Sequence, residues 1–141
     1  MKKMVLLVED HLDDIELARL GLENRSDTID LVVKESGEKA VEYLFDAEAM
    51  GKINGPALVL LDLNLGGIDG FEVVRRIRVN QATSRIPVVM LTTSNNRNDV
   101  ERAYDSGANS FITKPVDFGE FRTLINRVVD YWVVTNTGAA R

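Results

Sequence analysis

The chain has 141 residues, 45% of them hydrophobic and 28% charged, which is typical of a globular domain with its own core. Its formal net charge of -5 argues against binding a nucleic-acid backbone, since that affinity comes mostly from Lys and Arg. The absence of cysteine excludes disulfides, thiol catalysis and thiolate metal sites, so a bound cation would need oxygen ligands, which favour Mg²⁺ or Ca²⁺, or the single histidine.

Strand and helix patterns alternate along the chain. Runs of Val, Ile, Leu and Phe predict strands buried on both faces of a parallel sheet, and apolar residues at helical spacing predict the intervening helices. In chain order, the predicted elements are strand Met4–Val8, a helix with Ile15, Ala18 and Leu22 on its apolar side, strand Ile29–Val33, a helix with Ala40, Val41 and Leu44, strand Ala57–Leu61, a helix with Val73, Val74 and Ile77, strand Ile86–Leu91, a short polar helix at about Asp99–Ser106, strand Ser110–Thr113, and a last helix. We expect the short polar helix to be loosely held.

The last predicted helix carries a wide apolar stripe. The stripe comprises Phe118, Phe121, Ile125, Val128, Val129 and Trp132, and it is extended sideways by Leu124, Tyr131 and Val134. An ordinary packed terminal helix accounts for it, and the alternative is an exposed patch that pairs two copies. We carry a homodimer through this helix and strand Ser110–Thr113 as a hypothesis.

The alternation predicts an α/β fold, namely an open, doubly wound parallel sheet built from five β-α units with right-handed crossovers. No repeat or linker is evident, so we expect a single domain over 1–141, with a core over about 4–135 and a flexible tail at 136–141. No run approaches the roughly 20 apolar residues of a membrane span, and the N-terminus turns acidic too soon for a signal peptide. We therefore expect a cytoplasmic location.

Polar residues follow four of the predicted strands at the edge where such sheets bind ligands. In chain order they are Glu9 and Asp10, Asp62, Thr92 and Thr93, and Lys114 followed by Pro115. Crowded carboxylates resist ionisation unless a cation lies among them. Because Mg²⁺ prefers oxygen ligands and keeps open positions for phosphate, the cluster predicts a magnesium-dependent phosphoryl site, to which the lysine adds positive charge.

Each of these residues also has a simpler interpretation. Acidic residues after strands often cap a helix or lie solvated in a loop, threonine suits a strand, and Lys-Pro could form a plain turn. His11 is expected to be a surface residue without a role. The joint pattern favours the functional interpretation, because four separate strands each supply a residue that a phosphoryl site needs.

Five segments together resemble the receiver domain of two-component response regulators. They are "LLVED", "LLDLNL", "IDGFEVVRRIR", "PVVMLTTS" and "GANSFITKPV", and the resemblance runs from about Val5 to the end of the last helix. It implies a flavodoxin-like (CheY-like) fold, a three-layer α/β/α arrangement with strand order 2-1-3-4-5. The connection "DAEAMGKING" and the ending "VVDYWVVTN" are similar to stand-alone receivers that work with bacterial phytochrome-type histidine kinases.

The resemblance implies that Asp62 accepts a phosphoryl group from the phosphohistidine of such a kinase, in a Mg²⁺-dependent reaction. Asp10 would ligate the metal directly with help from Glu9, and Asp62 and the backbone carbonyl of Asn64 would complete the protein ligands. Mn²⁺ or Ca²⁺ could substitute for Mg²⁺ in a crystal. The protein would thus be a phosphoacceptor that catalyses its own phosphorylation and dephosphorylation, and not an enzyme acting on other substrates.

The resemblance also implies roles for residues around the acceptor. Lys114 would bind a phosphoryl oxygen, and its bond to Pro115 is expected to be cis. Thr92 would move toward the new phosphoryl group and vacate space into which the Phe111 ring turns, so that phosphorylation changes the surface. Some relatives have tyrosine at this position, but this chain has Phe111, which has no hydroxyl, so a switch that relies on a ring hydroxyl is excluded.

Two further features concern the surroundings of the acceptor. Asn64 and Ser94 are expected to tune the lifetime of the aspartyl phosphate, because their side chains can admit or shield water. Many receivers have proline where this chain has Gly66, so the "GG" pair predicts a looser loop.

Rival interpretations are less consistent with the residues. A flavodoxin-like cofactor protein or a dehydrogenase should carry a phosphate-binding loop after the first strand, where the chain reads "VEDHLDD". An EF-hand is excluded because the twelfth position of "DLNLGGIDGFEV", which must be a metal-binding Glu, is Val73.

The remaining alternative is a receiver-like docking or dimerisation module that is never phosphorylated. With no output domain expected, the partners would be the sensor kinase and an unidentified downstream protein, with neither nucleic acid nor membrane.

Overall fold

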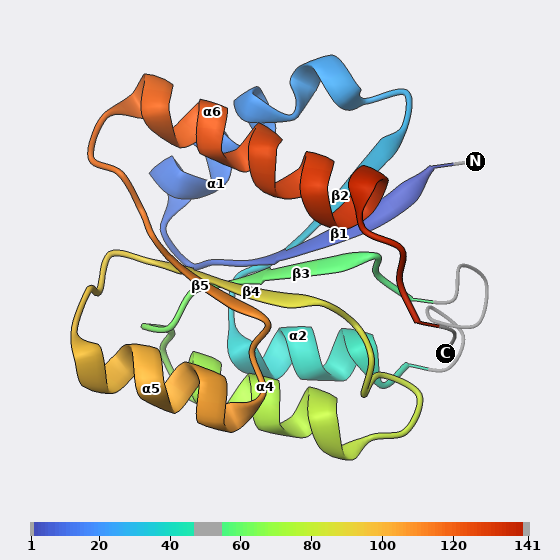
Figure 1. Cartoon of the computed structure of the whole chain (residues 1–141), viewed down its shortest axis with the longest axis vertical. Coiled ribbons are helices and arrows are strands. Elements are labelled where there is room, and N and C mark those ends of the chain that lie inside the picture. Colours follow the sequence, from blue (N-terminus) through green and yellow to red (C-terminus); the bar gives the residue numbers. More distant parts are fainter. Residues whose placement is uncertain (1, 47–54, 140–141) are drawn as a thin grey trace.

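The computed structural model describes residues 2–46 and 55–139, which form a twisted parallel sheet between two layers of helices (Figure 1). The strand order is β2-β1-β3-β4-β5, and every neighbouring pair is parallel. The strands are β1 (Lys3–Val8), β2 (Ile29–Lys34), β3 (Leu58–Leu61), β4 (Val88–Thr92) and β5 (Ser110–Thr113). This topology confirms the doubly wound α/β fold and the strand order 2-1-3-4-5.

The helices cover both faces of the sheet. They are α1 (Leu12–Gly21), α2 (Gly37–Leu44), α4 (Gly70–Val79), α5 (Arg97–Ser106) and α6 (Phe118–Val129), with a 3-10 helix at Glu23–Arg25 and a π-helix at Asp130–Thr135. Figure 1 shows α1 and α6 on one face and α2, α4 and α5 on the other. Most of "DAEAMGKING" and the last residues of the predicted tail, 140–141, lie outside the described residues. Within 2–46 and 55–139, no helix combines the length and hydropathy of a membrane span.

The core consists of two apolar clusters, one on each face of the sheet, because successive side chains of a strand point in opposite directions. On the three central strands, the residues facing α2, α4 and α5 are Leu6, Val8, Val59, Leu61, Val88 and Met90. Those facing α1 and α6 are Val5, Leu7, Leu58, Leu60, Val89 and Leu91. Burial on both faces explains why these strands read as continuous apolar runs.

The fourth strand is displaced toward the carboxyl end relative to its prediction. The sequence predicts a strand over Ile86–Leu91, whereas β4 begins at Val88. Pro87 has no backbone N–H to donate to the neighbouring strand, so the strand starts after it. The Pro87 carbonyl still accepts a hydrogen bond from Val59 N at 2.9 Å. As a result, Thr92 is the last residue of the strand and is fully buried.

Side-chain caps start four of the helices close to the strand ends. The capping side chains are Ser36 for α2, Asp69 for α4, Asn96 for α5 and Asp117 for α6, each accepting a hydrogen bond from a backbone N–H of the first turn. Each cap sets where its helix begins. Three of these capped turns, those of Asp69, Asn96 and Asp117, follow strands β3, β4 and β5 and so fix the loops along the carboxyl edge of the sheet.

Helix α5 is the most polar of the described helices, as expected, and its only buried residue is Ala103. The helix begins at Arg97, and Tyr104, which was expected on its apolar side, is largely exposed. Its predicted looseness stays a prediction.

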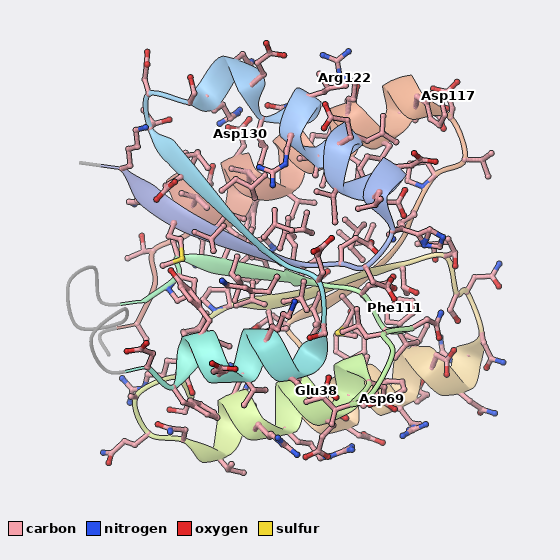
Figure 2. The ribbon with its side chains drawn as sticks, turned by 180° about the vertical axis from the view of Figure 1, so that it is seen from behind. Glu38, Asp69, Phe111, Asp117, Arg122 and Asp130 are labelled. Atoms are coloured by element: carbon pink, nitrogen blue, oxygen red, sulfur yellow. The ribbon has the colours of Figure 1, made fainter. Side chains whose placement is uncertain are left out.

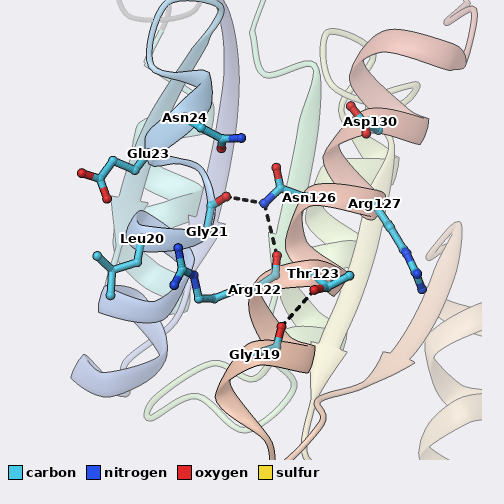
Figure 3. Close-up of a pocket in the computed structure, with 10 residues that line it drawn as sticks. All are labelled: Leu20, Gly21, Glu23, Asn24, Gly119, Arg122, Thr123, Asn126, Arg127 and Asp130. Carbon is cyan, nitrogen blue, oxygen red and sulfur yellow. Dashed lines mark hydrogen bonds between the residues drawn. The ribbon is translucent and has the colours of Figure 1, made fainter.

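Helix α6 packs beside α1 and buries most of its apolar stripe, including Phe121 and Ile125. Figure 3 shows Asn126 reaching from α6 to α1, where its side-chain amide donates to the carbonyl of Gly21. The first stripe residue, Phe118, is exposed because it is the first residue of the helix and lies beside the loop from β5.

The residues predicted to extend the stripe sideways remain at the surface. Tyr131 and Val134, in the π-helix, are 51% and 68% exposed, and Leu124 is half-buried against the α1–α6 cluster. The chain therefore carries apolar surface at the end of this layer that no described residue covers.

Candidate phosphoryl-transfer site

Buried polar side chains concentrate at the carboxyl edge of the sheet. Of the five buried polar or charged residues in the described part of the chain, four lie there, namely Glu9, Asp62, Thr92 and Lys114. The fifth, Thr83, donates its hydroxyl to a backbone carbonyl and is accounted for structurally. Burying charged groups is costly unless they are paired, so this edge is the candidate site.

Extensions of the sheet ladder hold the backbone of the site. The N–H of Asp62, just after β3, donates to the carbonyl of Val8 at 3.0 Å, and the N–H of Lys114 donates to that of Thr92 at 2.7 Å. The sheet thereby brings together side chains from strands that are distant in sequence, as the strand-end pattern predicted.

The Lys114 ammonium lies among three carboxylates. It donates to Glu9 Oε1 and, at 2.8 Å, to Asp14 Oδ2, and it lies 3.5 Å from Asp62 Oδ2. Burial by itself would lower the pKa of Lys114, but hydrogen bonds to Asp14 and Glu9 and the charge of Asp62 outweigh it and raise that pKa. The lysine is therefore a fixed positive charge beside Asp62.

Glu9 is the carboxylate most affected by burial. The pKa of Glu9 is raised to about 7, because desolvation by burial and the charge of Asp62 outweigh the opposing effect of the hydrogen bond from Lys114. The backbone N–H groups of Asp10 and His11 each donate to Glu9 Oε2 at 3.1 Å. The positive charge of Lys114 and these two N–H groups thus favour the ionised form of Glu9 against the cost of burial.

A divalent cation fits the donor set at this edge. Carboxylate oxygens of Glu9, Asp10 and Asp62 lie within 4.8 Å of one another, and Asp10 is exposed, so one side of the group is open to solvent. Three oxygen donors with an open side suit a hard cation that keeps water or phosphate ligands. Exposed Asn64 is held beside the group, because its N–H donates to Asp62 Oδ1 at 3.3 Å.

Asp14 is the site residue that sequence reasoning missed. It lies in the first turn of α1, where acidic residues are common for helix-dipole reasons alone. Its partner Lys114 is 100 residues away along the chain. No local pattern could have identified this pair.

The residues predicted to form the switch lie on β4 and β5. Buried Thr92 accepts a hydrogen bond from Ser94 N at 3.4 Å, and the Ser94 hydroxyl donates to Asp99 of α5 at 2.7 Å. Phe111, opposite Met90 in the sheet, is half-buried against the cluster on the α2, α4 and α5 face (Figure 2). Thr93, the residue after Thr92, is exposed.

One prediction about the site is wrong. The Lys114–Pro115 peptide bond was expected to be cis, but no peptide bond between described residues is cis. The trans form of an X–Pro bond is the more stable by about 0.5–1 kcal/mol, and with this isomer Lys114 already reaches Glu9 and Asp14.

The loop after Asp62, for which the "GG" pair predicts looseness, makes a contact with α2, and its looseness stays a prediction. Gly67 has a φ of 76°, and the N–H of Ile68 donates to Glu38 Oε2 of α2 at 3.1 Å. Glu38 and Asp69, the cap of α4, lie close together beside this loop in Figure 2. A Cβ added at Gly66 would have no neighbouring atom within 4 Å.

Comparison with known proteins gives a consistent result. A family model described as the response regulator receiver domain matches residues 5–126. The chain is 35% identical over 133 residues to the probable methanogenesis regulatory protein FilR2 of Methanothrix harundinacea, covering 94% of this chain and 85% of that protein. It is 34% identical over 135 residues to the response regulator Rcp1 of Synechocystis sp., covering 96% and 92% respectively.

Solved structures agree with the sequence comparison. The phosphorylated cyanobacterial phytochrome response regulator RcpA superposes with a TM-score of 0.91 at 34% identity, over 99% of this chain and 100% of that one. The Mn²⁺-bound form of Rcp1 superposes with a TM-score of 0.84 at 33% identity, over 98% and 99%.

Proposed function

Because the chain belongs to the family of response regulator receiver domains, which act in two-component signalling, we propose that Asp62 accepts a phosphoryl group from the phosphohistidine of a sensor kinase. One observation carries the proposal. Asp62 is a buried carboxylate at the end of β3, 3.5 Å from the Lys114 ammonium and grouped with Glu9 and Asp10.

The reaction is an in-line displacement at phosphorus. A carboxylate oxygen of Asp62 attacks, the N–P bond of the phosphohistidine breaks, and the histidine nitrogen leaves with the electron pair and takes a proton. The product is a mixed carboxylic–phosphoric anhydride. Because a carboxylate is a weak nucleophile, positioning and neutralisation of charge must supply most of the acceleration. Lys114 is placed to stabilise a phosphoryl oxygen.

We propose that Mg²⁺ is the cofactor, with Mn²⁺ or Ca²⁺ as substitutes. Glu9, Asp10 and Asp62 would hold it together with the backbone carbonyl of Asn64. When bound, the cation offsets the charge of the carboxylates and of the incoming phosphoryl group. The Mn²⁺-bound form of the relative Rcp1 supports a divalent cation.

The receiver would catalyse both its own phosphorylation and its own dephosphorylation. We assign Thr92 and Phe111 to the switch that follows, because Thr92 is buried at the end of β4 and Phe111 lies half-buried on β5. Asn64 and Ser94 would tune the lifetime of the phosphoryl group, since each lies two residues beyond a site residue, Asp62 or Thr92, and neither is buried.

The proposed partners follow from the relatives. A phytochrome-type sensor histidine kinase is supported by the similarity to RcpA, and a downstream protein would read the changed surface. A homodimer would use Tyr131, Val134 and Leu124 with β5. We place the protein in the cytoplasm, where such a kinase would present its phosphohistidine.

Mass spectrometry after incubation with phosphoramidate and Mg²⁺ tests the function. The wild type should gain the mass of one phosphoryl group, and Asp62→Asn should not. Asp27→Asn, which removes a charge from an exposed turn, is the matched control and should be modified like the wild type. A chain that stayed unmodified even with its cognate kinase would contradict the proposal and favour an unphosphorylated docking module.

A further inference from the structure

Asp14 is an acidic residue of the site to which the proposed mechanism gives no role. Its Oδ2 lies 2.8 Å from Lys114 Nζ, whereas Asp62 Oδ2 lies 3.5 Å away. The Lys114 side chain is 4% exposed and that of Asp14 is 24% exposed, so the pair is only partly screened by solvent. The lysine is thus bonded more closely to Asp14 than to the phosphoacceptor.

The donors of the ammonium group are mostly engaged away from Asp62. An ammonium has three N–H donors, and those of Lys114 that form hydrogen bonds go to Glu9 and Asp14. The 3.5 Å separation from Asp62 is beyond the usual N–H···O range of about 2.7–3.2 Å. Asp62 therefore attracts the lysine electrostatically but does not form a hydrogen bond with it.

Asp14 is not needed to anchor its own helix. Ile15 and Ala18 of α1 are buried in the cluster shared with α6, and Asn126 of α6 binds the carbonyl of Gly21 at the other end of α1. Helix α1 therefore keeps its place through contacts that do not involve Asp14. The contact with Lys114 is the one hydrogen bond of the Asp14 side chain that the described residues show.

We propose that Asp14 is a positioning residue that holds the Lys114 ammonium as a counter-ion and so weakens its action on the phosphoryl group. The inference rests on the proposed function of Asp62. A phosphoryl group on Asp62 brings anionic oxygens that compete with Asp14 for the lysine. Asp14 thus makes the phosphorylated state less stable than it would be if Lys114 were not paired with Asp14.

Beryllofluoride, which binds a carboxylate oxygen in place of a phosphoryl group, provides the test. Its affinity in the presence of Mg²⁺ can be measured by titration with ¹⁹F NMR. Asp14→Asn should tighten binding about fivefold, on the scale of a partly exposed ion pair. The same variant should lower the denaturation temperature, because a hydrogen bond to a buried lysine is weakened. A purely structural role would lower both stability and affinity.

Two variants control for charge and geometry. Asp13→Asn removes the same charge from the same helical turn at an exposed position, and it should bind beryllofluoride like the wild type. Asp14→Glu keeps the carboxylate and should also be close to the wild type. Equal or weaker binding by Asp14→Asn, or equal tightening by Asp13→Asn, would overturn the inference.

The failure of this inference can be told apart from failure of the proposed function. If wild type fails to bind beryllofluoride, or if Asp62→Asn binds it equally well, the assignment of Asp62 fails and the inference falls with it. If binding depends on Asp62 and Asp14→Asn does not tighten it, Asp62 keeps its role and only the role of Asp14 is refuted.

Discussion

At the scale of single residues, Lys114 supplies the positive charge that offsets the carboxylates of the site. Its ammonium lies between Glu9, Asp14 and Asp62, and all four side chains lie at one edge of the sheet. Removing one member of a buried group of charges lowers the free energy of unfolding by more than the ion pair itself contributes, because the remaining charges stay buried without an opposite charge.

We predict that Lys114→Ala lowers the free energy of unfolding by about 3 kcal/mol in the presence of EDTA. Mg²⁺ should stabilise this variant more than it stabilises the wild type, since the cation and the lysine neutralise the same carboxylates and their effects are coupled. Urea denaturation with and without Mg²⁺ measures both quantities.

The control for this prediction is Lys39→Ala, which removes a lysine from an exposed position on α2. It should change neither stability nor the effect of Mg²⁺ appreciably. Equal stabilisation of the wild type and Lys114→Ala by Mg²⁺ would show that metal and lysine act on different groups.

At the scale of elements, the loop between β3 and α4 determines how Asp62 and Asn64 are presented. Asn64 N–H is bonded to Asp62 near the start of the loop, and Ile68 N–H is bonded to Glu38 near its end. The helix that follows also packs closely on the strand, because a Cβ at Gly70 would lie 2.6 Å from the Asp62 carbonyl oxygen. The loop is thus held at three points.

The two adjacent glycines of this loop form a matched pair for a prediction. Gly67→Ala should destabilise the protein by about 1–2 kcal/mol, since the residue has a positive φ and an added Cβ would lie 2.0 Å from Glu38 Oε2. Gly66→Ala should stay within about 0.5 kcal/mol of the wild type, because its Cβ would enter open space. Urea denaturation compares them, and equal losses would mean that the contact with Glu38 does not constrain the loop.

At the scale of the whole molecule, the two helical layers differ in the apolar surface that they leave exposed. The α1–α6 layer ends in a π-helix that presents Tyr131 and Val134 to solvent. The opposite layer exposes Val79 at the end of α4, Tyr104 on α5 and Phe45 after α2, each on a different element. Two exposed apolar residues within one helical turn form a more continuous contact than residues on separate elements, which favours the α6 layer as the face that pairs two copies.

If the homodimer forms through this face, Val134→Glu should weaken it at least about tenfold in dissociation constant, since a charge would be buried at the interface. Sedimentation equilibrium, with and without beryllofluoride and Mg²⁺, measures the constant. Val79→Glu is the control on the opposite layer and should leave association unchanged. A wild type that remains monomeric under both conditions would exclude the dimer.

Local patterns in the sequence determined the architecture and the chemical character of the site. Runs that are apolar on both faces identify buried parallel strands, and parallel strands bring their carboxyl ends to one edge. The acidic residues, Thr92 and Lys114 could therefore be expected together from their positions alone, and the family resemblance added the role of Asp62.

Only the tertiary structure decided which side chains touch. The contacts Asp14–Lys114 and Glu38–Ile68 join residues 100 and 30 positions apart, and they depend on how α1 and α2 pack against the sheet and its loops. The exposure of Tyr131 likewise follows from packing. Periodicity specifies the face of an element, whereas the distance between two side chains depends on the packing of every element between them.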